Sequence, residues 1–202
     1  MFSQSNRWRS AALVAAVVSA GCVALPTDVY VPDAVAGVLI YESCSLTPEL
    51  PAGVKLQYSG LHAIVSIARS QDVNLVRVQC DVPDGSTLVL LEDFIKITEN
   101  AEKRTRLATI PDINPAAPAR YPETPAIQKL VLQVDSPLRG GRLHAGTLSF
   151  DRHYWIAAPV ERDLGSEVSL SLPEFSFNGT PARFPDIRFT RRLAIGSAFF
   201  NC

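Results

Sequence analysis

The chain has 202 residues, of which 47% are apolar and 19% are charged, and its formal net charge is -1. This balance excludes a disordered polyelectrolyte and gives no sign of a nucleic-acid partner, because such partners attract strongly basic surfaces. A chain of this length can bury one hydrophobic core, so the composition predicts a single folded domain.

The N-terminal 22 residues have the layout of an export signal. Arg7 and Arg9 precede an unbroken small-apolar run over residues 11–18, and no acidic residue interrupts this segment. Small residues then lead to a cysteine in the sequence Ser19-Ala20-Gly21-Cys22. A positive start, a short apolar stretch and small residues before a cleavage site are typical of a secretory signal peptide.

The Ser19-Ala20-Gly21-Cys22 ending resembles the lipobox of bacterial lipoproteins. The resemblance implies that residues 1–21 are removed, that Cys22 is acylated, and that its acyl chains anchor the protein in a membrane. Val23, rather than Asp, after the cysteine implies the outer membrane, facing the periplasm. The alternatives are an ordinary signal peptide cut after Ala20 or near Ala24, and a membrane anchor. The apolar run is much shorter than the roughly 20 residues that span a bilayer.

The cysteines that follow the signal are Cys44, Cys80 and Cys202. Outside the cytosol, an odd number permits one disulfide and leaves one free thiol. We expect the disulfide to include Cys202, because a terminal strand gains most from being pinned, with Cys44 as its partner. Two alternatives remain: a Cys44–Cys80 disulfide, or a state in which all three thiols are buried and reduced. No cysteine spacing fits a zinc or redox motif, so we expect no cofactor.

Residues 22–36 contain two prolines and no periodic pattern, which predicts a lipidated tether before a folded domain at 37–202. In the first half of that domain, short alternating or apolar runs separated by turn residues predict strands. These runs cover residues 37–43, 54–58, 62–68, 73–80, 87–91 and 94–98. Ser59-Gly60 and Asp84-Gly85 predict hairpins between the runs that they join. The polar segment 99–106 is either a hairpin tip or one helical turn.

The stretch 111–125 carries five prolines, which remove backbone donors and favour extended geometry. We interpret it as a crossover between two blocks of strands. The alternative is an exposed recognition loop that presents Arg120 and Tyr121.

The second block repeats the pattern of the first, with turn signals at Gly140-Gly141 and Asn178-Gly179. Its predicted strands cover residues 127–134, 142–150, 154–156, 167–172, 175–177, 187–189 and 193–200. No sustained run after Cys22 has the helical period. The predicted fold is therefore all-β, an antiparallel β-sandwich, with a β-barrel as the second choice.

Three histidines, His62, His144 and His153, are the obvious candidates for chemistry, and Asp151 stands two residues before the last of them. No third ligand stands at a diagnostic metal-binding spacing, and no Gly-x-Ser-x-Gly elbow, phosphate loop or dinucleotide fingerprint occurs. We therefore expect neither a metal site nor a catalytic residue.

The candidate binding residues are aromatic or basic. Tyr154 and Trp155 either belong to the core or anchor a protein contact at the surface. Arg188, Arg191 and Arg192 form either a solvated strand face or a patch for phosphate or an acidic partner.

Two functional hypotheses follow. The first is a lipid-anchored, non-enzymatic module that binds another envelope protein, as an accessory subunit of an envelope assembly or as a periplasmic inhibitor or immunity protein. The second is a lipid-anchored cell-wall hydrolase or carbohydrate-binding module, with a glycan as the partner. The first fits the absence of catalytic motifs, and a sandwich fold supports it only by analogy.

Overall fold

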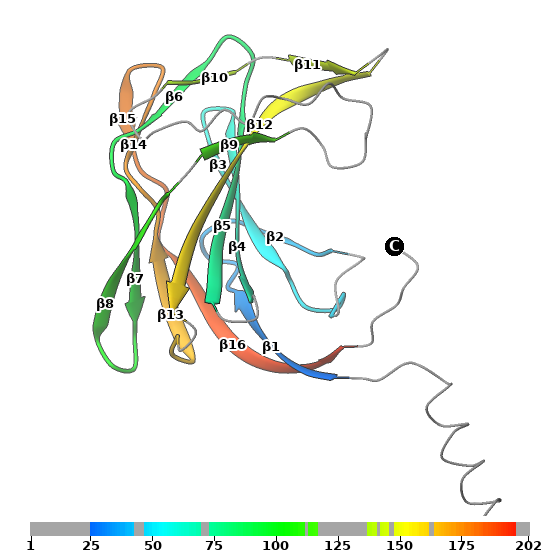
Figure 1. The fold of residues 1–202 in the computed structure, drawn as a ribbon, viewed down its shortest axis with the longest axis vertical. Coiled ribbons are helices and arrows are strands. Elements are labelled where there is room, and N and C mark those ends of the chain that lie inside the picture. Colours follow the sequence, from blue (N-terminus) through cyan, green and yellow to red (C-terminus); the bar gives the residue numbers. More distant parts are fainter. Residues whose placement is uncertain are drawn as a thin grey trace, which may run out of the picture.

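The computed structural model describes residues 25–42, 47–69, 73–111, 113–116, 137–140, 142–145, 148–161 and 164–196. Within these ranges all regular elements are β-strands, and each pair of neighbouring strands is antiparallel (Figure 1). No helix within the same ranges is long and apolar enough to cross a membrane. Several sequence predictions lie outside the described residues: the signal with Cys22, the disulfide candidates Cys44 and Cys202, the loop residues Arg120 and Tyr121, and the strand at 127–134.

The strands form three sheets. A five-stranded sheet has the order β1 (Leu25–Pro32), β16 (Ile187–Gly196), β13 (Glu167–Ser171), β7 (Phe94–Glu99) and β8 (Arg104–Thr109). A four-stranded sheet has the order β10 (Leu138–Arg139), β6 (Thr87–Leu90), β14 (Phe175–Phe177) and β15 (Thr180–Ala182). A seven-stranded sheet has the order β11 (Arg142–Ala145), β12 (Leu148–Glu161), β5 (Val73–Val82), β4 (Leu61–Arg69), β3 (Gly53–Tyr58) and β2 (Val38–Ile40), and β9 (Ile113–Ala116) pairs with β12.

The five-stranded and four-stranded sheets make one bent layer of a sandwich. β6 leads into β7 and β13 leads into β14, and these segments pair on both sides of the bend (Figure 1). At the bend, the Leu91 N–H donates to the Glu174 carbonyl at 2.8 Å. The seven-stranded sheet is the second layer, and none of the three sheets closes on itself in the part of the chain described. The predicted antiparallel β-sandwich is confirmed.

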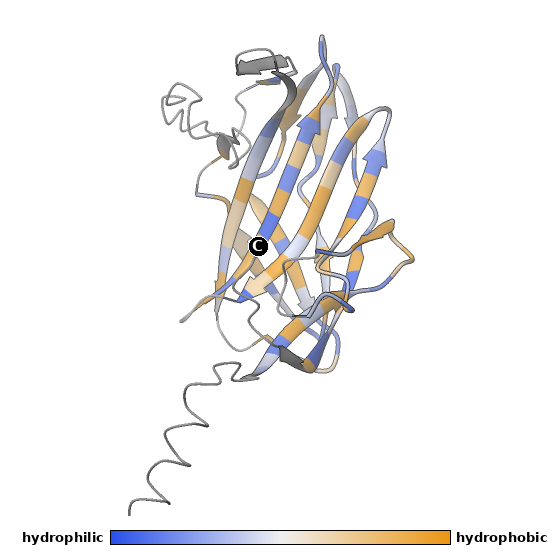
Figure 2. Cartoon of the chain, turned by 90° about the vertical axis from the view of Figure 1, so that its right-hand side faces the viewer, coloured by the Kyte–Doolittle hydropathy of each residue, from blue (hydrophilic) through white to orange (hydrophobic). Residues whose placement is uncertain are grey.

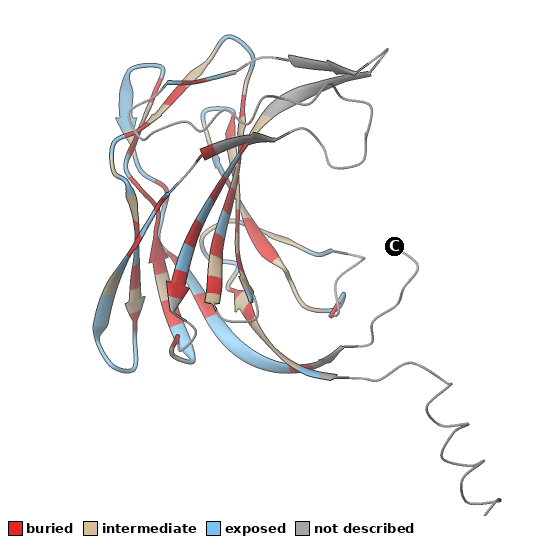
Figure 3. Cartoon of the chain, viewed as in Figure 1, coloured by how far each residue is buried: buried red, intermediate tan, exposed pale blue. Residues whose placement is uncertain are grey.

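Alternation along each strand builds the core between the layers. In β4, Leu61, Ala63, Val65 and Ile67 are buried, whereas the residues between them are half-buried (Figure 3). The bent layer contributes other fully buried side chains, among them Ile97, Leu170 and Phe189. Polar and apolar residues alternate along the strands of the seven-stranded sheet in Figure 2. Because successive side chains of a strand point to opposite faces, one face packs and the other stays available for contacts.

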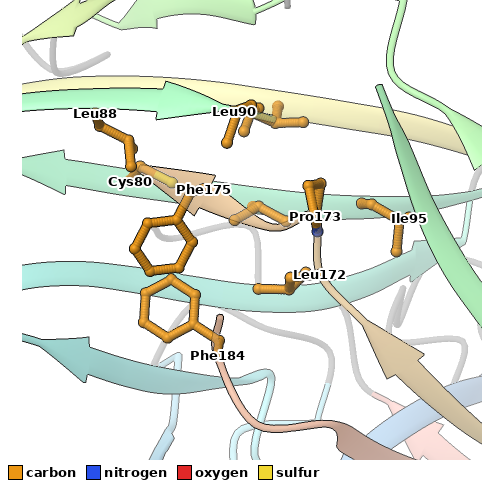
Figure 4. Close-up of a pocket in the computed structure, with 10 residues that line it drawn as sticks. Cys80, Leu88, Leu90, Ile95, Leu172, Pro173, Phe175 and Phe184 are labelled. Atoms are coloured by element: carbon orange, nitrogen blue, oxygen red, sulfur yellow. The ribbon is translucent and has the colours of Figure 1, made fainter. Parts of the chain in front are cut away.

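A small cavity lies in the core where the bent layer changes direction. It measures about 20 Å³, and its wall is wholly apolar (Figure 4). The lining residues are Val78, Cys80, Leu88, Leu90, Ile95, Ile156, Leu172, Pro173, Phe175 and Phe184. A space of this size holds about one water molecule and offers it no polar partner, so it is a packing void.

Strand β1 corrects the predicted tether. Residues 25–32 pair with β16 over their whole length, so the folded domain begins well before residue 37. Tyr30 points into the core and is 6% exposed. β1 is the edge strand of its sheet, and an edge tolerates Pro26 and Pro32 because one side of the strand needs no ladder donor.

The hairpin predicted at Asp84-Gly85 is also wrong, although the turn itself forms. The Ser86 N–H donates to the Pro83 carbonyl at 3.1 Å, and Gly85 has a φ of 74°. The strands on either side nevertheless enter different layers, because β5 pairs with β4 and β12 whereas β6 pairs with β10 and β14. The turn carries the chain from one layer to the other.

Other turn predictions are confirmed. Ser59-Gly60 joins β3 to β4, and the polar segment 99–106 is the tip and second arm of the β7–β8 hairpin. Asn178 and Gly179, with φ values of 51° and 83°, join β14 to β15 as a type I′ turn requires. Two predicted divisions are wrong: residues 154–156 belong to the 14-residue strand β12, and residues 187–189 continue into β16.

Cys80 carries a free thiol and is 4% exposed, so the alternative Cys44–Cys80 disulfide is wrong. Burial is the main cause that raises the pKa of this thiol to about 12, and the charge of Asp81 adds to it. Cys80 is therefore a small apolar core residue, since only the thiolate form of cysteine is reactive.

Candidate binding sites

The first candidate site lies on the outer face of the seven-stranded sheet. Strand register aligns His62, Asp81 and His153 across β4, β5 and β12, and in the next row it aligns Gln79 with Trp155. Residues two apart on a strand point to the same face, so these five side chains share one surface. We call this set, His62, Gln79, Asp81, His153 and Trp155, the Trp155 face.

Hydrogen bonds order the polar part of the Trp155 face. Asp81 Oδ1 lies 2.6 Å from His153 Nδ1, and Gln79 Nε2 donates to the same oxygen at 3.0 Å. An ionised carboxylate only accepts, so Nδ1 carries the imidazole proton. The side chains of His153 and Asp81 are 24% and 23% exposed, so both reach solvent from fixed positions.

The pleat of β12 separates the two aromatic residues that the sequence placed together. Trp155 is 40% exposed, as an anchor for a contact would be, whereas Tyr154 is 3% exposed. The Tyr154 hydroxyl donates to the Arg139 carbonyl at 2.8 Å, which ties β12 to β10. Tyr154 is therefore a core residue and not a surface anchor.

The Trp155 face combines an aromatic ring with fixed hydrogen-bonding groups. An imidazole oriented by a carboxylate is also the arrangement of a general base. In the described part of the chain, no three His, Cys, Asp or Glu side chains gather closely enough to hold a metal ion. The described groups therefore place an exposed indole ring beside hydrogen-bonding side chains whose positions are fixed.

The arginines at the end of the chain do not form one patch. Arg188, Arg191 and Arg192 are all exposed, but Arg192 neighbours Arg191 on β16 and points to the opposite face. Arg191 shares its face with Tyr30, its register partner on β1, and lines a pocket. The predicted basic patch is thus divided between the two faces of β16.

The pocket that Arg191 lines is the second candidate site. It has a volume of about 390 Å³ and lies between the β7–β8 hairpin, the loop before β13, and β16. We call it the arginine pocket; its lining residues are Glu99, Ala101, Glu102, Arg104, Arg106, Leu164, Gly165, Ser166 and Arg191.

A buried ion pair forms one wall of the arginine pocket. Arg106 Nε lies 2.6 Å from Glu99 Oε1, and the two side chains are 14% and 2% exposed. The orientation of these two atoms does not meet hydrogen-bond geometry, so the contact is chiefly electrostatic. The other carboxylate oxygen, Oε2, accepts a hydrogen bond from the Gly165 N–H at 3.1 Å.

Sequence reasoning missed this ion pair, although the sequence contains a signal for it. Glu99 follows Ile95 and Ile97 in the buried phase of β7. A carboxylate at such a position needs a partner, because a lone buried charge is costly. Register places Arg106 opposite Ile97, on the same face as Glu99.

Three further hydrogen bonds fix the loop around residues 164–167. The Tyr30 hydroxyl donates to the Leu164 carbonyl at 3.0 Å. The Arg191 N–H donates to the Ser166 carbonyl at 2.7 Å, and the Asn100 N–H donates to the Glu167 carbonyl at 3.1 Å. Burial raises the pKa of the Tyr30 hydroxyl, and the nearby Arg191 charge opposes that shift only in part. The hydroxyl therefore stays a donor at neutral pH.

The fold and these sites define an antiparallel β-sandwich protein with two surface sites, one centred on an exposed tryptophan and one lined by arginines. Comparisons with protein-family models, curated proteins and solved structures found no match. The function is therefore inferred from the sites themselves, because many different functions share the β-sandwich.

Proposed function

We propose that this chain is a non-enzymatic binding module of the bacterial cell envelope that docks another envelope protein on the Trp155 face. It acts as an accessory subunit of an envelope assembly or as a periplasmic inhibitor or immunity protein. The observation that carries the proposal is the position of Trp155, which is 40% exposed on a rigid strand beside ordered polar groups.

Such an arrangement suits a protein contact for two reasons. Tryptophan is among the residues most enriched at interface positions that contribute most to affinity. Side chains already held in place also lose little conformational entropy on binding, and the Gln79–Asp81–His153 contacts hold them before a partner arrives.

The test compares two exposed apolar side chains. The full chain, Trp155→Ala and Leu107→Ala are immobilised and exposed to envelope extract, and the affinity of the retained protein is measured for each. Leu107, 61% exposed on edge strand β8, is the matched control. We expect Trp155→Ala to weaken binding roughly 30-fold and Leu107→Ala to leave it unchanged. Equal affinities for all three proteins would show that Trp155 does not contribute to the interface.

The proposed location is the outer membrane, where acylated Cys22 anchors the protein so that it faces the periplasm. We expect Cys22→Ala to abolish incorporation of labelled fatty acid and to release the protein from the membrane fraction. Cys80→Ala is the control, because it also removes one cysteine but leaves the lipobox-like sequence intact. Lipid labelling that persists in Cys22→Ala would refute the assignment.

The second candidate function is binding or cleavage of cell-wall glycan. The observation that favours it is the Asp81–His153 pair beside an exposed indole, since an aromatic ring can stack on a sugar and an oriented imidazole can act as a base. The test is sedimentation with purified cell wall and measurement of released sugars. Release that is lost in His153→Gln but kept in His62→Gln would favour the hydrolase, and no sedimentation with cell wall would exclude both forms of this candidate.

A further inference from the structure

The arginine pocket carries a second inference, which is independent of docking on the Trp155 face. Three guanidinium groups and two carboxylates line the pocket, an excess of one positive charge. One of those carboxylates, Glu99, is held inside the wall by Arg106 and by the Gly165 N–H. Arg106 thus balances the charge of Glu99 within the wall, and the sum of the charges that line the pocket is positive.

The pocket has the volume and the preorganised structure of a binding site. Its volume of about 390 Å³ falls in the range of roughly 300–1,000 Å³ that is typical of small-molecule sites. The loop at residues 164–167 is fixed by hydrogen bonds that it accepts from the Tyr30 hydroxyl and from the backbone N–H groups of Asn100 and Arg191, and by the bond that the Gly165 N–H donates to Glu99. A loop fixed in this way does not have to be ordered when a ligand binds, which reduces the entropic cost.

The side chains of the pocket select the chemical class of the ligand. Arg104 and Arg191 line it from two different strands, β8 and β16. Guanidinium groups match the paired oxygens of carboxylate and phosphate groups, and their hydrogen bonds to such anions are roughly twice as strong as neutral ones.

We infer that the arginine pocket binds the carboxylate or phosphate group of a small ligand, with Arg104 and Arg191 as the residues that contact the anion. Ala101, Leu164, Gly165 and Ser166 line the rest of the pocket and add no charge to it. Cationic ligands are disfavoured by the same positive charge that attracts the anion.

The test titrates the full chain with inorganic phosphate and, separately, with succinate, by calorimetry at low salt. We expect saturable binding of at least one probe, which weakens as sodium chloride screens the charges. Arg191→Gln and Arg104→Gln should each weaken that binding about tenfold. Arg192→Gln is the matched control, because it removes the same charge from the neighbouring position, on the opposite face of β16, and should leave affinity unchanged.

Two outcomes would overturn the inference. If neither probe binds, the pocket is not an anion site; if Arg192→Gln weakens binding as much as Arg191→Gln, the probes sense only general surface charge. Thermal unfolding of each variant separates loss of binding from loss of fold. A preference for one probe identifies the anion as phosphate or carboxylate. A failed Trp155→Ala experiment leaves these outcomes unaffected, because the two sites share no residue.

Discussion

Replacing Glu99 with Gln tests whether the wall of the arginine pocket is held by its ion pair. Glu99 is 2% exposed and lies 2.6 Å from Arg106, whose side chain is 14% exposed. Removing one partner of a fully buried pair costs about 3–5 kcal/mol, because the remaining charge stays buried. Arg106 borders an open pocket and can regain some hydration, so we expect Glu99→Gln to lower the free energy of unfolding by about 2–3 kcal/mol.

Equilibrium unfolding in urea measures this loss. The control is Glu102→Gln on the turn of the same hairpin, where the side chain is exposed and the change should stay within about 0.5 kcal/mol. The double variant Glu99→Gln/Arg106→Gln should lose less stability than the sum of the losses in the two single variants. The reason is that Arg106→Gln removes the positive charge that Glu99 no longer balances. A loss below about 0.5 kcal/mol for Glu99→Gln, or strict additivity in the double variant, would refute the reasoning.

Three further predictions follow from individual positions. Because the pKa of Cys80 is raised to about 12 by burial, while an unfolded thiol ionises near 8.5, the unfolded chain gains charge first as the pH rises. Above about pH 9 the free energy of unfolding should therefore fall more steeply with pH than in Cys80→Ala, by about 1.4 kcal/mol per pH unit. Urea titrations at several pH values measure this difference. Parallel pH profiles of the two proteins would contradict it. Gly179→Ala should lower the free energy of unfolding by about 1 kcal/mol. The cause is the backbone φ of 83° alone, because nothing lies within 4 Å of the added Cβ. An unchanged thermal midpoint would count against the turn assignment. Tyr154→Phe should lower stability by about 1 kcal/mol through loss of the bond to the Arg139 carbonyl, yet leave Trp155-dependent affinity intact; weaker partner binding would place Tyr154 in the interface after all.

The sequence by itself determined the features of the fold that depend on neighbouring residues. Alternation with period two along β4 and β5 predicted strands with one buried face, and the structure has them within two or three residues. Ser59-Gly60 and Asn178-Gly179 predicted tight turns because glycine and asparagine readily adopt positive φ. The sequence left Tyr154 and Trp155 each as a core residue or a surface anchor, and the pleat of β12 then buried Tyr154 and exposed Trp155.

Only the tertiary structure decided which strands pair and which side chains meet. Asp84-Gly85 fixes a reversal of a few residues, but burial of apolar faces in two layers sends the strands on either side of it to different sheets. β1 became a strand because a distant segment, β16, pairs with it along an edge where prolines are tolerated. The arginine pocket joins residues from three separate segments, and no local spacing encodes such a meeting. Local conformation follows from local sterics and turn chemistry, whereas strand pairing and sites depend on the burial that the whole chain achieves together.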